Sequence, residues 1–256
     1  MPWTQRETLA AAWGIVITVA LAVAAVAARA LTPIAGVVAA AFGCVIVVLV
    51  GYPYLALLIL FVVGSVLATR FRIDEKRKKN VQEGTAGERG VSNVVAHIVL
   101  PTALAIAGGL SPPAIPMSEL TVLYASALAF GAADTFASEL GVLAGQARSI
   151  LSGRPVPPGT NGGVSAVGEG WGLVGAVLTA VIGLAFFRLF GTAISNVGLF
   201  LGTVTVAGFL GCQVDSVLGE TLEDRGYLTK GSTNFLGMLS AVIIAAVILA
   251  VAGTVG

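Results

Sequence analysis

Long apolar segments alternate with short polar segments along the whole chain. A helix needs about 20 consecutive, mostly apolar residues to cross a bilayer, within a range of about 17 to 25. The segments that meet this requirement predict eight spans, at residues 8–28, 34–51, 53–69, 93–110, 119–143, 169–190, 194–216 and 234–255. We therefore expect an all-α polytopic membrane protein that forms a single membrane domain over residues 1–256.

Composition supports the membrane assignment. Hydrophobic residues make up 57% of the chain and charged residues 11%, and the mean hydropathy is +0.96. A typical soluble domain has about 25% charged residues. The net charge of +1 gives no reason to expect a nucleic-acid partner. Cys44 and Cys212 lie inside predicted spans without metal-ligand spacing, so we assign both to packing.

The basic residues between the predicted spans indicate the orientation. An even number of spans places both termini on one side of the membrane, together with Arg6 and Arg188. The opposite side carries the other basic residues, which are Arg29, Arg70, Arg72, Lys76, Arg77, Lys78, Lys79, Arg89, Arg148, Arg154, Arg225 and Lys230. Because Lys and Arg are enriched in cytoplasmic loops, we expect loops 70–91, 144–168 and 217–233 to be cytoplasmic. Both termini would then lie outside the cell membrane.

Two related acidic motifs end the fifth and seventh predicted spans. The runs Asp134-Thr-Phe-Ala-Ser-Glu139 and Asp215-Ser-Val-Leu-Gly-Glu220 share the pattern D-[TS]-x-x-[SG]-E and lie about 80 residues apart. Both spans run in the same direction, so we expect a parallel acidic-motif repeat whose two helices meet at one shared site. Removing an unpaired carboxylate from water costs several kcal/mol or more, so acids in such segments usually mark a functional site.

Helix geometry separates the roles of these acids. Side chains at i and i+5 point about 140° apart on an ideal helix, so Asp134 and Glu139 cannot bind one ion unless that helix unwinds. We expect Asp134 and Asp215 to bind Mg²⁺ or Mn²⁺, with water and substrate phosphate oxygens as the other ligands. Glu139 and Glu220 would support this site or bind a second ion. The alternative is a set of buried salt bridges to arginines, for which the candidates are Arg148, Arg154 and Arg225.

Three polar segments offer candidate phosphate ligands. Glycines in the Gly/Pro-rich loop 152–165 would let backbone N–H groups approach an anion, and Arg225 and Lys230 would neutralise phosphate charge. The end of loop 70–91, from residue 83 to Asn93, also resembles part of a site, with Arg89 flanked by glycines. An ordinary connector is the alternative for loop 152–165, and residues 74–79 are interpreted as a solvated helix extension or a contact for anionic membrane lipids.

Two common nucleotide and hydrolase arrangements are missing from the sequence. It contains no G-x-x-x-x-G-K-[ST] pattern, which excludes a Walker-type site. No Ser-His-Asp arrangement is available either, because the single histidine, His97, lies four residues after Asn93 at the start of the fourth predicted span. We interpret His97 as a structural residue. The candidate nucleotide and phosphate contacts are Asn93, Ser138, Glu139, Gly159, Thr160, Asn161, Gly162, Gly163, Ser165, Ser216, Glu220, Lys230 and Asn234.

Four motifs in order resemble a known family. They are Arg89…Asn93, D-T-x-x-S-E-[LI]-G at Asp134 to Gly141, P-x-G-T-N-G-G-V-S at Pro157 to Ser165, and D-S-x-L-G-x-T-L-x-x-R from Asp215 to Arg225. Together they are similar to the TMEM19-like, or DUF92, membrane family, which includes the plant phytyl-phosphate kinase. The resemblance covers about residues 80–240, the expected catalytic region, whereas the three helices within residues 1–69 carry no matching motif.

The resemblance implies CTP-dependent, or other NTP-dependent, conversion of an isoprenoid monophosphate to its diphosphate at the cytosolic membrane face. The lipid would be a phytyl, geranylgeranyl or other polyprenyl phosphate, and Arg89, Asp134, Asp215 and Arg225 would be catalytic. A prenyl monophosphate is already ionised near pH 7, so the reaction needs positioning and charge neutralisation but no strong general base. A chain with one histidine and with acid, Asn, Gly and Arg positions at its cytosolic face suits that requirement.

Other functions and assemblies remain open at this stage. A lipid cytidylyltransferase or a lipid-alcohol kinase is the alternative enzyme. An ion-coupled transporter is a further alternative, because parallel repeats with acids in the membrane also suit carriers. The G-x-x-x-G pattern at Gly198 and Gly202 could support a homodimer, although we expect it to serve helix packing inside the chain.

Overall fold

A computed structural model describes residues 5–82, 87–110 and 112–255, and nearly all of its regular structure is helical. Its long helices are α1 (Gln5–Ala27), α2 (Pro33–Val50), α3 (Tyr52–Arg70), α5 (Val91–Gly109), α6 (Met117–Gly141), α7 (Ala166–Leu189), α8 (Val197–Leu218) and α9 (Lys230–Val255). A short helix, α4 (Ile73–Lys78), lies between α3 and α5. Among the described residues, eight helices are long and apolar enough to cross a membrane, which confirms the predicted spans to within a few residues.

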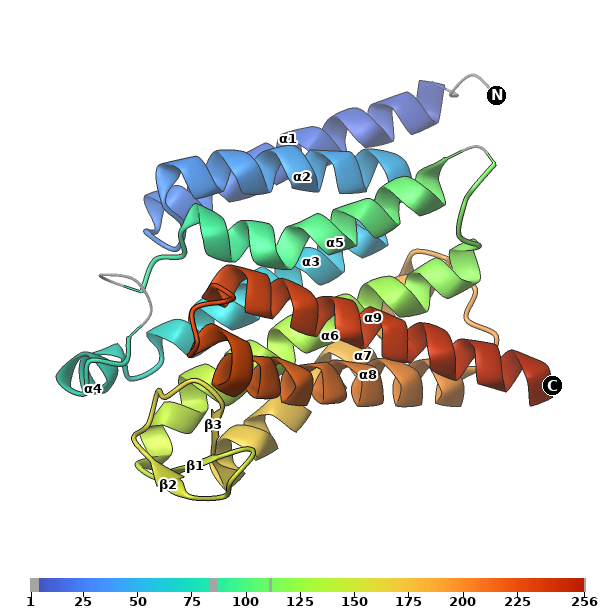
Figure 1. The fold of residues 1–256 in the computed structure, drawn as a ribbon. Helices are drawn as coiled ribbons and strands as arrows, with labels where there is room; N and C mark the ends of the chain where they lie inside the picture. The colour runs from blue at the N-terminus through green and yellow to red at the C-terminus, as the bar shows by residue number, and fades with distance from the viewer. Residues whose placement is uncertain (1–4, 83–86, 111, 256) are drawn as a thin grey trace.

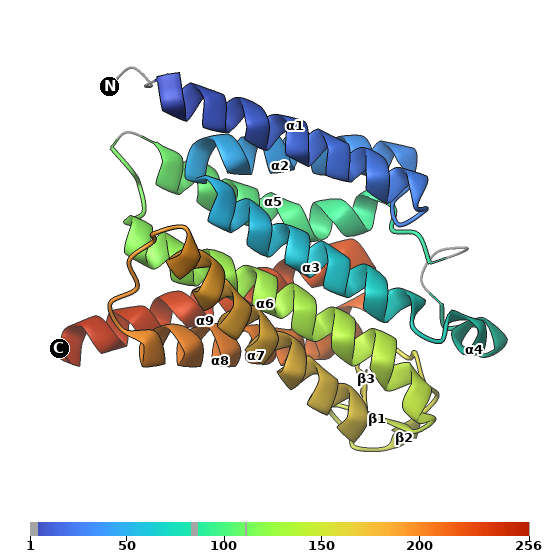
Figure 2. The same ribbon diagram turned by 180° about the vertical axis from the view of Figure 1, so that it is seen from behind.

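Helix α6 is the centre of the bundle. It contacts α3, α5, α7, α8 and α9, and 83% of its most apolar window is buried, the largest share among the eight spans. Small residues allow this close packing, because a Cβ added at Gly175 of α7 would lie 2.7 Å from the Ala132 carbonyl oxygen. A Cβ added at Gly208 of α8 would lie 2.6 Å from Ala129 Cβ. Figures 1 and 2 show α6 between its neighbours from both sides.

The two helices that carry the acidic motifs run in the same direction and pack against each other. Both α6 and α8 end at the same end of the bundle, beside the small β-sheet in Figure 1. A 3₁₀ turn, η1 (Val142–Ala144), extends α6, and a π-helical turn, η2 (Gly219–Glu223), extends α8. The expected parallel repeat is therefore present, and α8 with its π turn continues seven residues past the predicted end of that span at residue 216.

The Gly/Pro-rich segment after α6 is the one departure from an all-α fold in the described residues. It forms a three-stranded antiparallel sheet of β1 (Ala147–Ser149), β2 (Pro155–Val156) and β3 (Gly163–Val164), in the order β2-β1-β3. Arg148 of β1 pairs with Pro155 on one side and with Val164 on the other. The segment is thus a fixed cap over the ends of the motif helices rather than an open loop.

Helix α1 is the outermost span. Only 11% of its apolar window is buried, and it packs mainly on α2. Hydrogen bonds hold it near both ends: the Tyr52 hydroxyl donates to the Ala10 carbonyl oxygen, and the Arg70 guanidinium donates to the Ala28 carbonyl oxygen. The two chain termini lie at the end of the bundle opposite the sheet and α4 (Figure 1).

The glycine pair in α8 does not serve packing inside the chain, contrary to the expectation from sequence. A Cβ added at Gly202 would meet no atom within 4 Å, and one at Gly198 would meet only the nearby Asn196 side chain, at 3.6 Å. Both glycines are exposed on the bundle surface. The close helix contacts are made instead by glycines further along α8, such as Gly208 and Gly211.

Candidate functional site

A polar cleft of about 310 Å³ lies where α6 and α8 end and where α7 and α9 begin. The β-sheet segment forms one of its walls (Figure 1). It brings together most of the candidate residues that the sequence had identified: Asp134, Ser138, Glu139, Gly159, Thr160, Asn161, Gly162, Gly163, Ser165, Asp215, Ser216, Lys230 and Asn234. Four separate segments of the chain therefore converge on one cleft: the end of α6, the loop 159–165, the end of α8 and the start of α9.

The two motif aspartates lie in this cleft within range of each other's charge. The charges of Asp134 and Glu223 both repel that of Asp215, and the ammonium group of Lys230 attracts it. Asp215 Oδ1 is buried and has no hydrogen-bond partner among the described residues. Acids that are grouped in a partly desolvated setting favour a bound cation, because repulsion and lost hydration both disfavour the charged forms.

The donor set fits Mg²⁺ better than a metal held by protein ligands alone. The described residues contain no group of three or more His, Cys, Asp or Glu side chains arranged to hold a metal. Mg²⁺ usually keeps several waters and takes one or two carboxylates together with substrate phosphate oxygens. Asp134 and Asp215 would supply the two carboxylates, and Asp215 Oδ1 is an acceptor still open for such a contact.

Glu139 of the first motif is held by protein contacts. Its carboxylate accepts hydrogen bonds from the Lys76 ammonium group at 2.7 Å and from the Thr69 hydroxyl at 3.0 Å. The Lys76 side chain is fully buried and also donates to the carbonyl oxygens of Ala68 and Thr69. These contacts favour a supporting role for Glu139 over direct metal binding.

The interpretation of residues 74–79 as a wholly solvated segment was therefore wrong at Lys76. The alternative of salt bridges to arginines also named the wrong cation for Glu139. Helix α4 turns Lys76 toward the bundle while Arg77 and Lys78 remain exposed. A buried ion pair thus ties the α3–α4 segment to the end of α6.

Glu220 of the second motif binds the sheet segment. Its carboxylate accepts hydrogen bonds from the Ser149 hydroxyl at 2.6 Å and from the Leu151 backbone N–H at 3.4 Å. It lies in the π-helical turn η2, and such turns are frequent at functional sites. Glu220 does not line the cleft, so it supports the sheet against the second motif.

The glycine-rich run approaches the protein's own backbone closely. Gly162 has a φ of +67°, and an added Cβ would lie 2.5 Å from Glu220 Cβ and 2.7 Å from the Ser216 carbonyl oxygen. Asn161 Nδ2 donates to Asp224 Oδ1 at 3.0 Å. Residue 162 has to be glycine because it packs so closely against the second motif that a side chain would overlap it.

Two hydroxyl side chains fix the remainder of this run. The Thr160 hydroxyl donates to the Pro157 carbonyl oxygen at 2.8 Å. Ser165 caps α7, because its hydroxyl oxygen accepts the Gly168 backbone N–H at 3.0 Å. Such N-caps are strongly preferred at helix starts. The protein's own contacts therefore hold this run at both ends.

Three further candidate residues, besides Glu220, do not line the cleft. Arg89 is buried and donates to Asn93 Oδ1 at 2.8 Å and to the Thr69 hydroxyl at 3.3 Å, and both Arg89 and Asn93 line a different cavity. Arg225 is exposed beyond η2 and does not line the cleft. Arg89 reaches the first motif only indirectly, through Thr69. Residues 83–86 of the same segment lie outside the described residues.

Sequence reasoning missed two acids that line the cleft, Glu169 and Glu223. Glu169 lies in the first turn of α7 and accepts a hydrogen bond from Gln213 Nε2 at 2.8 Å. A carboxylate at the edge of a predicted span was a visible signal for Glu169. Glu223 was hidden because the π turn continues α8 beyond its apolar segment.

The structure supports the packing roles expected for His97 and for the buried Cys212, whereas Cys44 is half-buried. The His97 ring stacks with Phe61 and Phe130 at centroid distances of 5.5 and 6.4 Å. Its Nδ1 lies 2.9 Å from the Asn93 carbonyl oxygen. Cys44 and Cys212 are both free thiols. His97 therefore packs among aromatic rings beside the cavity that Arg89 and Asn93 line, and Cys212 is buried in a cluster with Ala133 and Ala176.

Comparison with known sequences identifies the family. Residues 16–238 match the family described as integral membrane protein DUF92. The chain belongs to this family. The match begins well before residue 80, so it also covers most of the three N-terminal helices in which the sequence had offered no motif.

The similar proteins in this DUF92 family come from distant organisms. The chain is 32% identical over 250 residues to the uncharacterized membrane protein sll0875 of Synechocystis sp., with 93% of each chain covered. It is 30% identical over 207 residues to the uncharacterized membrane protein MJ0933 of Methanocaldococcus jannaschii, with 80% of each covered. Protein PGR of Arabidopsis thaliana is 30% identical over 195 residues, covering 69% of this chain and 67% of that protein. No solved structure matches the chain.

Replacing Lys76 by Met should destabilise this DUF92 protein strongly. The change leaves the Glu139 carboxylate buried without its cation, which typically costs about 3–5 kcal/mol. Chemical unfolding in detergent micelles would measure the loss. Lys78→Met, on the exposed side of the same helix, is the control and should change stability little. Equal stability of the two variants would show that the Lys76–Glu139 contact is not a folding constraint.

Replacing Gly162 by Val should displace the sheet segment from the second motif, because the new side chain meets Glu220 and Ser216. A displacement of about 1 Å at a reacting site can cost about 100-fold in rate. Gly153→Val is a matched control, since Gly153 has the same φ of +67° but an added Cβ there meets nothing within 4 Å. If the cleft is a reacting site, as proposed below, its turnover in membranes should therefore fall far more for Gly162→Val. A similar effect of both changes would assign the loss to backbone strain.

Proposed function

We propose that this protein is a membrane kinase that phosphorylates an isoprenoid monophosphate to its diphosphate, using Mg²⁺ or Mn²⁺ and a nucleoside triphosphate, with CTP as the first candidate. One observation carries the proposal: Asp134 and Asp215 converge from two parallel helices on a polar cleft that the glycine-rich run also lines. The reaction class is the one implied by the resemblance to the family that includes phytyl-phosphate kinase.

The residues of the cleft suit phosphoryl transfer between two phosphates. The ionised oxygen of the lipid phosphate would form a bond to the γ-phosphorus as the bond from that phosphorus to the β–γ bridging oxygen breaks, which releases the nucleoside diphosphate. The lipid phosphate brings its own charge, so no side chain has to remove a proton. This agrees with a cleft whose lining contains acids, amides and Lys230 but no histidine among the described residues.

Charge neutralisation is the main task of such a site. A bound Mg²⁺ supplies positive charge to the phosphate oxygens, and Asp134 and Asp215 would hold it. Lys230, in the first turn of α9, lies on the cleft wall where its ammonium group can face a phosphate. Asn161 and Asn234 line the same cleft and offer amide donors. Together these groups would align the two phosphates.

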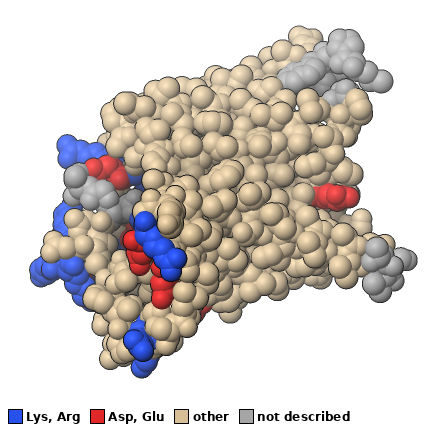
Figure 3. Space-filling view, in the orientation of Figure 1, with Lys and Arg blue, Asp and Glu red and all other residues tan. Residues whose placement is uncertain are grey.

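The position of the cleft favours an interfacial enzyme over a carrier. It lies at the end of the bundle where most of the described Lys and Arg residues gather (Figure 3), opposite the termini. By the positive-inside rule we assign this end to the cytoplasm, where nucleotide and Mg²⁺ are available. A lipid phosphate held at the interface could reach it from the bilayer.

Product analysis distinguishes the kinase from the alternative enzyme. Lipid diphosphate and CDP support the kinase, whereas pyrophosphate and CDP-lipid indicate a cytidylyltransferase.

Asp134→Asn and Asp215→Asn should each reduce turnover by about 100-fold or more while the protein still folds. Each change removes a metal-ligand charge and relieves carboxylate repulsion. The assay would incubate purified protein with Mg²⁺, a panel of nucleotides and prenyl monophosphates, and would measure lipid diphosphate. Asp74→Asn, at an exposed residue of α4, is the control. Near-normal rates in either variant at saturating Mg²⁺ would exclude the shared metal site.

Cysteines introduced at Ser152 or Thr229 should face the cytoplasm. In a background that lacks Cys44 and Cys212, they should resist impermeant thiol reagents applied to intact cells and react in inverted vesicles. Both residues are exposed at the cleft end of the bundle, so labelling reports topology rather than burial. The reverse pattern would place the cleft away from cytosolic nucleotide, and the kinase proposal would be abandoned.

A further inference from the structure

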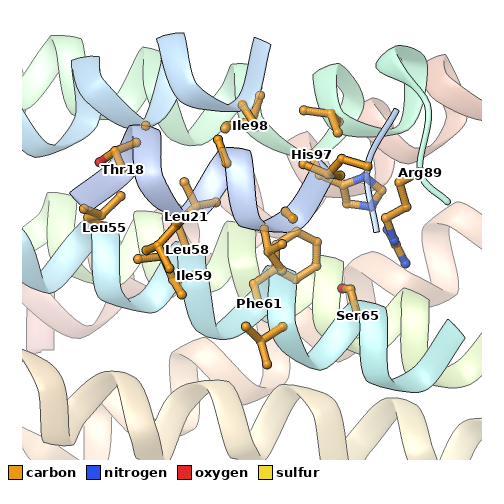
Figure 4. Close-up of a pocket in the computed structure, with 18 of the residues that line it drawn as sticks. Thr18, Leu21, Leu55, Leu58, Ile59, Phe61, Ser65, Arg89, His97 and Ile98 are labelled. Carbon is orange, nitrogen blue, oxygen red and sulfur yellow. The ribbon is translucent and has the colours of Figure 1, made fainter. Parts of the chain in front are cut away.

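A second cavity, of about 160 Å³, lies between α1, α2, α3 and α5. Figure 4 shows its walls, in which aliphatic and aromatic side chains such as Leu21, Leu58 and Phe61 predominate. The hydroxyl of Thr18 donates to the Gly14 carbonyl oxygen at 2.7 Å, so this polar group is satisfied within α1. The body of the cavity is therefore apolar, and it lies within the three N-terminal helices and α5.

One end of this cavity is polar. Ser65, Arg89 and His97 lie together at that end in Figure 4, whereas Thr18 and Leu55 lie at the other. Ser65 is only 1% exposed, and its hydroxyl has no hydrogen-bond partner among the described residues. A buried hydroxyl normally has a partner, and leaving it without one is unfavourable. The Ser65 hydroxyl is therefore positioned to bind a polar atom of a ligand.

The polar end of the cavity lies close to the proposed catalytic cleft. Arg89 donates to the Thr69 hydroxyl at 3.3 Å, and that hydroxyl donates to Glu139 of the cleft wall at 3.0 Å. A Cβ added at Gly131 would lie 3.2 Å from His97 Cδ2, and Gly131 precedes Asp134 by about one helical turn. The polar end of the cavity thus packs against α6 and is joined to the cleft wall by the Arg89–Thr69–Glu139 contacts.

We propose that this cavity holds the hydrocarbon segment next to the phosphate of a single-chain lipid phosphate. The chain would leave the cavity past Ser65 and Arg89, so that its phosphate lies on the cleft side of these residues, where the Arg89 charge complements it. This inference rests on the proposed function, and it gives the N-terminal helices a role in binding the lipid substrate. It concerns the lipid-binding residues, and the transfer step itself is unchanged.

The size of the cavity limits what it can hold. An apolar cavity of about 150 Å³ lined by Leu, Ile and Phe stays dry and accepts a benzene-sized guest. The volume here, about 160 Å³, therefore corresponds to about one isoprene unit, and the rest of the chain would extend into the bilayer beside α1. Two acyl chains would not fit, so the proposed ligand is a lipid phosphate with a single hydrocarbon chain.

The test uses a farnesyl monophosphate that carries a photoreactive diazirine on the isoprene unit nearest the phosphate. Ala25→Phe fills the cavity, because Ala25 lines it, and Ala24→Phe is the matched control on the exposed side of the same turn. We expect Ala25→Phe to lower crosslinking in the absence of nucleotide by about tenfold and to raise the KM for farnesyl monophosphate. The nucleotide KM and the Tm should stay unchanged, and Ala24→Phe should match the unmodified protein.

A second variant protects the test against a folding defect in the first. Ser65→Ala removes a hydroxyl that has no partner in the described residues, so the Tm without lipid should stay the same or rise. Its affinity for farnesyl monophosphate should fall about threefold to tenfold, the usual effect of one lost hydrogen bond. An unchanged affinity would remove Ser65 from the lipid site.

The outcomes separate this inference from the kinase proposal. Crosslinks in the cavity without any diphosphate product would support lipid binding and exclude the kinase. Normal lipid KM and crosslinking in Ala25→Phe, with Asp134→Asn inactive, would overturn the cavity as the lipid site and leave the kinase proposal standing. Competition by phosphatidylcholine as strong as by unlabelled farnesyl monophosphate would show that the cavity takes ordinary membrane lipid, which also overturns the inference.

Discussion

The structure depends on one electrostatic constraint: two carboxylates have to be held near each other at the end of a mostly apolar bundle. Asp134 and Asp215 repel each other, and one oxygen of Asp215 is buried without a hydrogen bond among the described residues. Such an arrangement is unfavourable in a low-dielectric setting unless a cation joins it. The cleft around the aspartates, with Lys230 on its wall, is organised to meet that requirement.

The bundle supplies the rigidity that this arrangement needs. Glycines of α7, α8 and α9 let neighbouring helices approach α6 so closely that an added Cβ would overlap backbone or ring atoms. At Gly237 of α9, for example, the overlap would be with Phe130 and with Asp215 Cβ. Functional groups on packed helices hold their geometry better than groups on loops. The aspartates are therefore positioned by helix packing before any ligand binds.

A second layer of contacts joins the loops to the same helix ends. The Lys76–Glu139 pair connects α4 to the first motif, and Glu220 connects the small sheet to the second motif through Ser149. Glu139 and Glu220, the equivalent acids of the two motifs, thus each bind another segment of the chain to a helix end. In each motif the glutamate is thus held by protein contacts, whereas the aspartate lines the cleft.

The sequence by itself determined the membrane class, the eight spans and the parallel repeat, because apolar length and motif direction are local properties of the chain. Most of the candidate residues that it identified, including Asp134 and Asp215, line the cleft. Only the tertiary structure decided that Lys76 would pair with Glu139, since the partners are 63 residues apart and the choice depends on how α4 packs. The small sheet was equally hidden, because strands of two or three residues carry no periodicity that a sequence pattern can show.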